Sequence, residues 1–533
     1  MDRLDRVSIA SLITAAAALC AAYGCTRQDP PIGVGATASA VASAAVSTAP
    51  SADPAPASSA DDDDIADDAG VPDASVDASA EVPEGSDVDV KVGGEFKIAA
   101  TSTNAWIYAG PNDETTKLGY LRMGAIVDRS EKPIARTKRC KGGWYRVAPK
   151  GFICAGKRAT LDVNDPVVVA SWKPPMRGEP LPYRYGRSKE VAPHLYYRAP
   201  SRKEQERAET IRWAEYMPNY PKERFLPYVG QVDEVPPFLL DGKSLPKPYG
   251  ATTRLRHPSG HEGKSSNHSS FAFQSIHEIE GRMFGLTTDL LLVPLDRVNM
   301  VKLTEIHGGP IPDLPAGIVL GSATKFLPDE KGNPKKVGEY QRFDTVGLTG
   351  ATRGDMWETA DGHWISATAM KVIRKRDEKH EEWPSFAKAE PAKKWIDVSV
   401  KNQMLIAYEG TRAVYVTSVS TGIGDLGDPE KTLATKRGVF TIKAKHLTAT
   451  MSSDESVDDY ELSDVPYVQY FQEGYALHAA FWHEKFGRPW SHGCVNLTPR
   501  DAAWIFEWTD PQLPKEWHGI QGNGEGTIVY VHP

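Results

Sequence analysis

From Gly94 to its end, this chain carries its apolar residues in short runs that Gly, Pro, Asn and Asp separate. Short apolar or alternating runs bounded by turn residues are typical of β-strands. Such runs occur at 96–98, 105–108, 125–127, 144–147, 395–400, 404–408, 413–418, 438–442 and 526–531. Glu409, Gly410 and Thr411 join two of these runs and give a hairpin signal. We therefore expect a mainly β, multidomain protein that ends in a mixed β-sandwich.

The length of 533 residues suggests about three or four domains. Hydrophobic residues make up 40% and charged residues 25%, so most of the chain can fold as globular protein. The net charge of −8 argues against a nucleic-acid partner, because such proteins carry basic surfaces. Much of that charge comes from the acidic tract around 61–64, so it says little about the folded part.

Residues 1–25 resemble an export signal. Arg3 and Arg6 precede an apolar run over 7–23, and Cys25 follows directly. The end of the run resembles a bacterial lipoprotein signal, and this resemblance implies lipidation at Cys25. Cleavage and release without lipid is the alternative, and a retained anchor would need a span of about 20 apolar residues.

Residues 26–93 consist mostly of Ala, Ser, Pro, Val and Asp, with almost no aromatic residues. Such a segment buries too little surface to offset its chain entropy, so we expect a disordered linker.

The region 94–163 contains a Gly-Gly-Trp-Tyr hairpin pattern that resembles bacterial SH3-like domains. The resemblance implies a small N-terminal β-barrel that either binds wall peptide or acts as a spacer. Cys140 and Cys154 flank this hairpin, and a disulfide between them fits an exported protein.

The region 164–390 gives weaker signals. Ser201 and Glu204 form a capping box that opens a helix expected to reach Glu215. Strands are expected at 290–293, 317–320, 343–346, 357–359 and 363–365. The last of these suggest a second SH3-like module at about 315–375. Four histidines have no ligand spacing and are expected in solvated loops: His257, His261, His268 and His277.

The residues 491–496 read Ser-His-Gly-Cys-Val-Asn, and His478 lies sixteen residues before Cys494. A thiol needs a base before it becomes a good nucleophile at neutral pH, and an imidazole suits that task. Gly493 allows close approach of a substrate, and the amides of Gly493 and Cys494 are candidates to face an oxyanion. Ser491 and His492 are placed to order the turn.

A helix start follows the cysteine. Thr498 reads as an N-cap, Pro499 as the first helical residue, and Asp501 as an acid in the first turn. Apolar residues continue at helical spacing. This order predicts a helix dipole next to Cys494 that favours the thiolate.

These residues resemble the signature of the L,D-transpeptidase catalytic domain over about 394–533. The resemblance implies that Cys494 accepts the acyl group and that His478 is its base, oriented by the carbonyl of Ala479. It also implies that His492 shapes the oxyanion site. Ala479 and Asn496 depart from commoner residues at their positions and, with Tyr475, are candidate substrate contacts. Aromatic strand residues such as Tyr475 more often pack than bind, and 447–472 is expected to form a flap.

The implied activity is peptidoglycan L,D-transpeptidation through a Cys494 thioester, with stem peptides as partners and no cofactor. Water as the acceptor would instead give an L,D-carboxypeptidase. A zinc site at His478, His483, His492 and Cys494 lacks the usual ligand spacing, so no metal is expected. A non-enzymatic wall-binding lipoprotein is a third alternative. The resemblances together place the protein in the periplasmic envelope, anchored to the membrane by lipid, and they set no oligomeric state.

Overall fold

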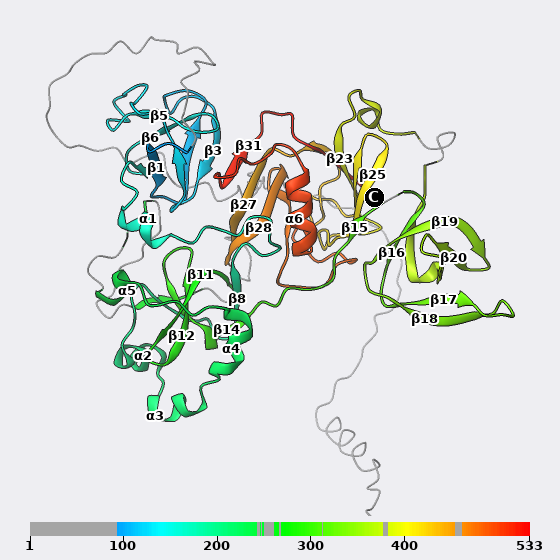
Figure 1. Ribbon diagram of the computed structural model, residues 1–533, viewed down its shortest axis with the longest axis horizontal. Coiled ribbons are helices and arrows are strands. Elements are labelled where there is room, and N and C mark those ends of the chain that lie inside the picture. The colour runs from blue at the N-terminus through cyan, green and yellow to red at the C-terminus, as the bar shows by residue number, and fades with distance from the viewer. Residues whose placement is uncertain are drawn as a thin grey trace, which may run out of the picture. The chain divides into compact units, whose positions relative to one another are not determined.

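The computed structural model describes residues 93–241, 246, 248–249, 261–265, 268–311, 313–376, 382–452 and 461–533. These residues form mainly β-structure with a few short helices, as the sequence predicted (Figure 1). The predicted leader 1–25 with Cys25, the acidic tract, nearly all of the linker and His257 lie outside the described residues. Among the described helices, none is both long and apolar enough to cross a membrane.

The N-terminal region forms two small sheets. Its elements are β1 (Lys97–Ala100), β2 (Ala105–Tyr108), β3 (Lys117–Leu121), β4 (Ile126–Asp128), β5 (Trp144–Arg146), β6 (Phe152–Cys154), β7 (Ala159–Thr160) and α1 (Pro166–Ala170). The order β4-β1-β7 forms one sheet, and β3-β2-β6-β5 forms the edge of a larger one. Cys140 and Cys154 are joined in a disulfide. The SH3-like assignment of this region stays a prediction.

The N-terminal region shares a sheet and a core with the end of the chain. Strand β3 pairs with β31 (Gly519–Gln521), and a Cβ at Gly119 would lie 2.3 Å from the Gly519 carbonyl oxygen. Glycine is therefore required where the two backbones approach. Buried residues of both segments, such as Ile107 and Trp517, form one apolar cluster.

The middle region contains an antiparallel sheet with short helices. Its strands are β8 (Arg184–Ser188), β9 (His194–Tyr196), β10 (His261–Lys264), β11 (Ser270–Ile279), β12 (Arg282–Thr287), β13 (Leu292–Pro294) and β14 (Val298–Met300). Its helices are α2 (Arg202–Glu209), α3 (Trp213–Tyr216), α4 (Lys222–Val229) and α5 (Pro237–Asp241), with 3₁₀ turns at Met217–Asn219 and Leu295–Arg297.

Two expectations for the middle region need correction. The capping box at Ser201 and Glu204 is present, but α2 ends at Glu209 because Thr210 takes the left-handed conformation with φ 55°. The expected helix to Glu215 is therefore split in two. His277 is 1% exposed within β11 and bonds to Ser275, so it is not a solvated loop residue. Strand β11 is buried on both faces, which hides the alternation that marks a surface strand.

The third region is a seven-stranded sheet. Its elements are β16 (Ala316–Val319), β17 (Ala323–Pro328), β18 (Pro334–Tyr340), β19 (Thr345–Arg353), β20 (Met356–Thr359), β21 (Trp364–Ser366), a 3₁₀ turn (Ala367–Ala369) and β22 (Met370–Ile373). Four of these strands coincide with runs expected from the sequence. Its relation to SH3-like modules stays a prediction.

The C-terminal region contains the predicted strands and one longer helix. Its elements are a 3₁₀ turn (Ser385–Lys388), β23 (Lys394–Ser399), β24 (Met404–Glu409), β25 (Arg412–Ser418), β26 (Gly438–Thr441), β27 (Ala444–Ser452), β28 (Glu461–Gln472), β29 (Tyr475–Ala479), β30 (Val495–Leu497), α6 (Pro499–Trp508), β31 and β32 (Ile528–His532). Strands β15 (Gly309–Pro310), β25, β24, β23, β32 and β26 form one sheet in that order. Helix α6 packs against β28 and β29. Figure 1 shows α6 beside β28.

The segment 447–472, expected as a flap, forms two long paired strands in its described part. Residues up to Ser452 and from Glu461 onward belong to β27 and β28, which pair with each other. Asp464 is buried within β28 because Arg122 donates to both of its carboxylate oxygens and Thr288 and Thr448 each donate at 2.5 Å. An acid that looks solvated in the sequence is thus a buried contact between three regions.

Helix α6 begins as predicted. The Thr498 side chain accepts from the Asp501 amide, and Pro499 is the first helical residue. The buried Asp501 carboxylate accepts from Tyr415, Thr417 and the amide of Gly308. Because β15 and Gly308 come from residues before 394, the C-terminal sheet is not complete within 394–533.

Candidate active site

Cys494 lies at the start of a parallel strand pair. Strand β30 follows it directly and pairs with β29, where His478 is opposite Asn496. Partner residues and residues two apart in a strand point to the same face. His478, Asn496 and Cys494 are therefore directed to one face of the pair. The Ala476 amide bonds to the Cys494 sulfur, which holds the thiol beside β29.

His478 is arranged as a neutral base. Its ring is 3% exposed, and Nδ1 lies 3.1 Å from the Ala479 carbonyl oxygen. A carbonyl only accepts, so Nδ1 carries the proton and Nε2 has the free lone pair. Burial lowers the pKa of His478 to about 4, against a smaller opposing effect of the Ala479 carbonyl. The Trp482 ring stacks on it with centroids 5.7 Å apart.

Cys494 is a thiol and not a thiolate in this arrangement. It lies in an apolar cluster with Tyr470 and Trp482, and its Sγ is 3.7 Å from the Gly474 carbonyl oxygen. Burial raises the pKa of Cys494 to about 11, although the Ala476 amide lowers it. The expected help from the α6 dipole is wrong, because β30 separates Cys494 from the helix start and the dipole acts only near the first turn.

The turn before Cys494 is held by side chains. Ser491 Oγ donates to the Cys494 carbonyl at 2.5 Å and accepts from the Gly493 amide at 3.1 Å. Thr435 Oγ1 donates to the Gly493 carbonyl at 2.7 Å. The Gly493 amide is therefore engaged within the turn. Of the two amides that were expected to face an oxyanion, only the Cys494 amide remains a candidate. The His492 side chain is exposed.

Comparison with known proteins locates the family likeness in this region. Residues 393–531 match the family model of the L,D-transpeptidase catalytic domain. We refer to them as the L,D-transpeptidase-like region. The putative L,D-transpeptidase YciB of Bacillus subtilis is 27% identical over an alignment covering 21% of this chain and 59% of that protein. This chain therefore spans less than two thirds of that relative's length.

Solved structures are also similar to part of this chain. The NMR structure of the catalytic domain from the E. faecium L,D-transpeptidase is 23% identical and covers 27% of this chain and 100% of that chain, with a TM-score of 0.21. The crystal structure of the L,D-transpeptidase from Stackebrandtia nassauensis is 26% identical and covers 27% and 58%, with a TM-score of 0.19.

The L,D-transpeptidase-like region also contains a residue pair that the sequence did not single out. Asn496 Nδ2 lies 2.9 Å from His483 Nε2, and His483 Nδ1 accepts from the Lys485 amide at 3.1 Å. The sequence raised His483 only as a weak zinc ligand. Within the described part of the chain, no group of three His, Cys, Asp or Glu side chains is placed to hold a metal ion. The sequence did offer one indication that His483 belongs to the site, because Trp482 and His483 follow His478 closely along the chain.

Tyr475 packs over the turn before Cys494, and this makes Gly493 sensitive to substitution. Gly493 has φ 129°, and a Cβ there would lie 3.0 Å from the Tyr475 ring. We expect Gly493→Ala to displace the Tyr475 ring and the thiol together and to lower turnover by about 10- to 100-fold, because small misplacements are costly in catalysis. Gly524→Ala is the matched control, since Gly524 has φ 94° with open space around it. Equal effects of both variants on turnover, measured beside thermal unfolding, would contradict this expectation.

The protonation state of Cys494 predicts its reactivity with pH. A thiol with a pKa of about 11 is neutral at pH 7, and each added pH unit raises its thiolate fraction about tenfold. We therefore expect the rate of Cys494 alkylation by iodoacetamide, measured by peptide mapping, to rise steadily from pH 7 to 9. A plateau below pH 8 would instead reveal a preformed thiolate paired with His478.

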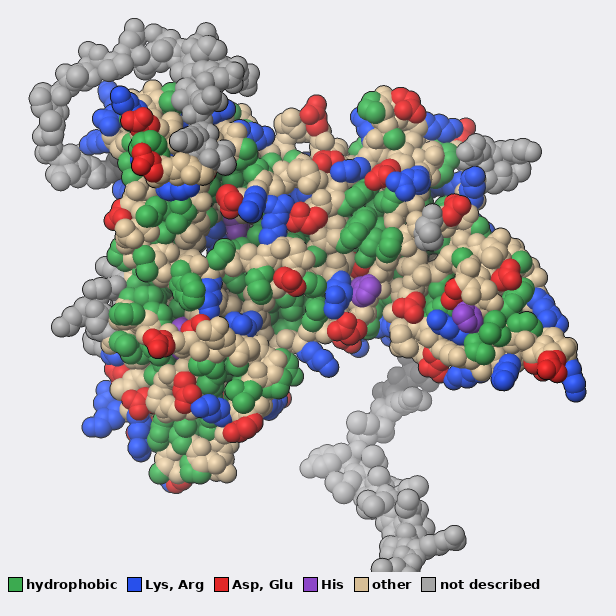
Figure 2. Space-filling view, viewed as in Figure 1, with side chains coloured by type: hydrophobic (Ala, Val, Ile, Leu, Met, Phe, Trp, Pro, Cys, Tyr) green, Lys and Arg blue, Asp and Glu red, His purple; other side chains and the backbone are tan. Residues whose placement is uncertain are grey.

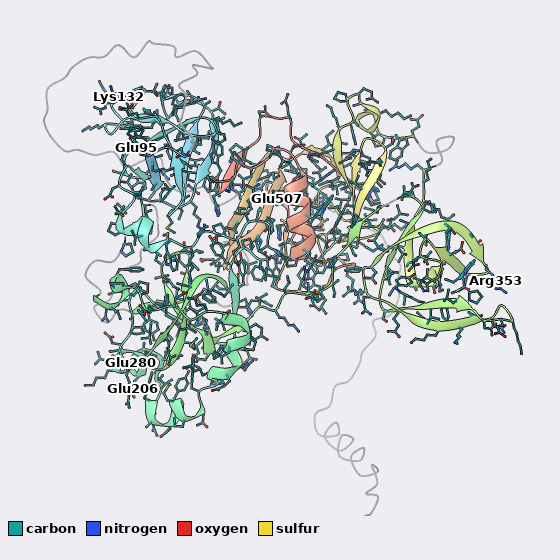
Figure 3. The ribbon with its side chains drawn as sticks, viewed as in Figure 1. Glu95, Lys132, Glu206, Glu280, Arg353 and Glu507 are labelled. Atoms are coloured by element: carbon teal, nitrogen blue, oxygen red, sulfur yellow. A yellow bond between two sulfur atoms is a disulfide. The ribbon has the colours of Figure 1, made fainter. Side chains whose placement is uncertain are left out.

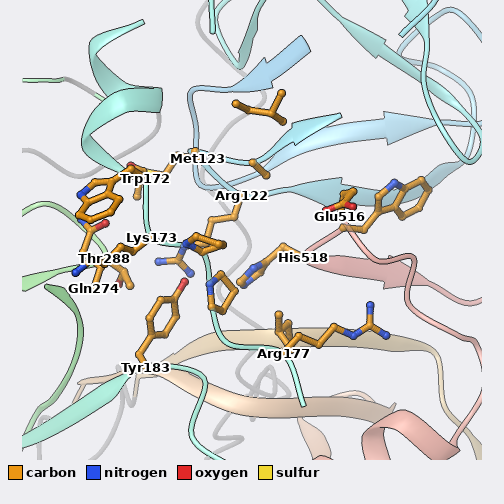
Figure 4. A pocket seen from close by; sticks show the side chains of 18 of the residues that line it. Arg122, Met123, Trp172, Lys173, Arg177, Tyr183, Gln274, Thr288, Glu516 and His518 are labelled. Carbon is orange, nitrogen blue, oxygen red and sulfur yellow. The ribbon is translucent and has the colours of Figure 1, made fainter. Parts of the chain in front are cut away.

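A cavity of about 290 Å³ lies away from Cys494 and His478. Arg122, Trp172, Tyr183 and His518 line it together with neighbouring residues (Figure 4). Three of its cations are already paired with carboxylates: Arg122 with Asp464, Lys173 with Asp233, and Arg177 with Glu507, which is labelled on α6 in Figure 3. The cavity therefore belongs to the junction of the regions and offers few free charges to a ligand.

The visible surface has no large area of one charge. Lys and Arg side chains alternate with Asp and Glu over the face in Figure 2. This mixture gives no basic track of the kind that binds a nucleic-acid backbone.

Proposed function

We propose that this protein is a peptidoglycan L,D-transpeptidase whose acyl-enzyme is a thioester on Cys494. The observation that carries the proposal is the neutral His478, whose Nδ1 is committed to the Ala479 carbonyl, on the same strand face as Cys494. The likeness of residues 393–531 to L,D-transpeptidase catalytic domains supports it. Because that likeness covers about a quarter of the chain, the activity of the whole protein is part of the proposal.

The chemistry follows from the two protonation states. His478 Nε2 takes the thiol proton as Cys494 Sγ attacks the carbonyl of the third stem-peptide residue. The Cys494 amide faces the oxyanion. When the tetrahedral intermediate collapses, the C–N bond breaks and the imidazolium returns its proton to the departing D-alanine amine. An acceptor amine, deprotonated by His478, then attacks the thioester and releases the thiol.

The remaining regions are assigned by the same proposal. Residues 94–163 and 315–375 act as SH3-like modules that contact wall peptides or set spacing. Residues 1–25 direct export with lipidation at Cys25, and residues 26–93 act as a tether in the periplasm.

The proposal is tested with the full chain, because β15 comes from outside the L,D-transpeptidase-like region. Purified protein is incubated with a disaccharide-tetrapeptide, and the products are followed by mass spectrometry. Transpeptidation predicts loss of alanine together with a cross-linked dimer. Alanine loss without a dimer would assign carboxypeptidase activity. An unchanged substrate, with wall binding retained in a pull-down, would assign the non-enzymatic alternative.

A further inference from the structure

The loop between β29 and β30 borders the thiol and is held from outside the L,D-transpeptidase-like region. Arg187, on β8 of the middle region, donates from Nη1 to the Trp482 carbonyl at 2.9 Å. Arg342, from the third region, donates from Nη2 to the Phe486 carbonyl at 2.7 Å. Trp482 stacks on His478, so Arg187 holds the part of the loop next to the base.

Arg187 has donors left over after this contact. Its Nε is buried and has no hydrogen-bond partner among the described residues. Within the same residues, no carboxylate acts on its pKa, which burial alone lowers. Buried donors are normally satisfied, so this Nε calls for a partner that the described residues do not supply.

Strand pairing connects Arg187 to a strand that contributes to the apolar cluster around Cys494. Ser270 is the cross-strand neighbour of Arg187, and its Oγ is also buried without a partner in the described structure. Ser270 pairs in turn with Leu462, which shares an apolar cluster with Trp482 and Cys494. The unsatisfied polar atoms of Arg187 and Ser270 therefore belong to neighbouring strands, and the strand of Ser270 pairs with β28 of the L,D-transpeptidase-like region.

The charge of Arg187 complements an acyl-donor peptide. Burial keeps the two histidines of the site, His478 and His483, neutral by lowering the pKa of each to about 4. A tetrapeptide donor, by contrast, ends in a carboxylate one residue beyond the carbonyl that Cys494 attacks, and consecutive Cα atoms are about 3.8 Å apart. Arginine pairs with carboxylates through two parallel N–H groups.

This chain already displays that pairing elsewhere. Arg177 donates from Nε and Nη2 to the two oxygens of Glu507, each at 2.9 Å. In Arg187 the Trp482 contact uses Nη1, and Nε on the other edge has no partner among the described residues.

We propose that Arg187 binds the terminal carboxylate of the acyl-donor peptide through Nε and Nη2 while its Nη1 stays on the Trp482 carbonyl. This assignment rests on the proposed transpeptidase function. It makes the middle region part of the substrate site, and it makes Arg187 a specificity determinant for donors with a free C-terminus.

The test compares two donors on the full chain: a tetrapeptide with a terminal carboxylate and the same peptide with a terminal carboxamide. We expect Arg187→Gln to lower kcat/KM for the carboxylate donor by about 30-fold, as a lost charge-assisted hydrogen bond does, and to change the carboxamide donor much less. Arg187→Lys keeps the positive charge but lacks the two parallel N–H donors of the guanidinium. We expect its kcat/KM for the carboxylate donor to lie between those of the wild type and Arg187→Gln. Arg342→Gln is the matched control, because it also removes an arginine from a loop carbonyl and should affect both donors alike.

The results distinguish a role of Arg187 in carboxylate binding from a role in positioning the loop. A fall in the carboxylate-to-carboxamide ratio for Arg187→Gln, but not for Arg342→Gln, supports the assignment. Equal losses on both donors for Arg187→Gln would make Arg187 a positioning residue only and overturn the inference while the enzyme activity stands. A wild-type protein that turns over neither donor would overturn the proposed function and this inference with it.

Discussion

Replacing Cys494 with alanine is expected to abolish acyl transfer, lowering turnover by roughly 10⁴-fold or more, to the uncatalysed background. The reason is that Cys494 is the one cysteine among the described residues outside a disulfide, and it shares a strand face with the neutral His478. Turnover of a tetrapeptide donor by the full-length variant provides the measurement.

Ser491→Ala is the comparison that separates chemistry from geometry. Ser491 holds the turn by bonds to the Cys494 carbonyl and the Gly493 amide, without itself reacting. We expect turnover to fall by an intermediate factor of about 10- to 100-fold, from misplacement of the thiol.

Full activity of Cys494→Ala, in a protein with unchanged thermal unfolding, would show that another residue carries the reaction.

Arg282→Met is expected to cause the largest loss of stability in the middle region. The Arg282 side chain is fully buried and donates to Glu209 at 2.6 Å and to Asp296 at 2.8 Å. Its removal leaves two buried carboxylates without their main partner, which costs about 3–5 kcal/mol of unfolding free energy. Denaturant unfolding, monitored by hydrogen exchange of the β11 and β12 amides, would measure the loss of unfolding free energy in this region.

Arg212→Met is the matched control in the same region. Arg212 pairs with Glu215 at 3.1 Å, but the two side chains are 83% and 70% exposed. Solvent screens this pair, so its loss is expected to cost less than about 1 kcal/mol. If Arg282→Met were as mild as Arg212→Met, the buried cluster would not be a determinant of the middle region's stability.

Local sequence signals predicted the parts of the fold that local physics controls. Thr498 and Pro499 start α6 as expected, and the hairpin at Gly410 joins β24 to β25. These features depend on neighbours within a few residues. The residues 491–496 and His478 were found for the same reason, since their spacing along the chain is visible without the fold.

The parts that failed depend on partners far away in the sequence. The segment 447–472 looked polar in the sequence, yet Arg122, 342 residues before Asp464, pairs with this carboxylate within β28, which is buried. Arg187 could not be linked to the site before the fold placed it on the carbonyl of Trp482, 295 residues later. The raised pKa of the Cys494 thiol likewise follows from burial, which the spacing of the motif does not reveal.

An acyl-thioester between Cys494 and a stem peptide is most directly detected by mass spectrometry of the intact full-length protein after brief incubation with a disaccharide-tetrapeptide. We expect an adduct equal to the donor less one alanine, mapped to the Cys494 peptide and removed by hydroxylamine. Release of alanine with no adduct on Cys494, and with undiminished release by Cys494→Ala, would contradict it.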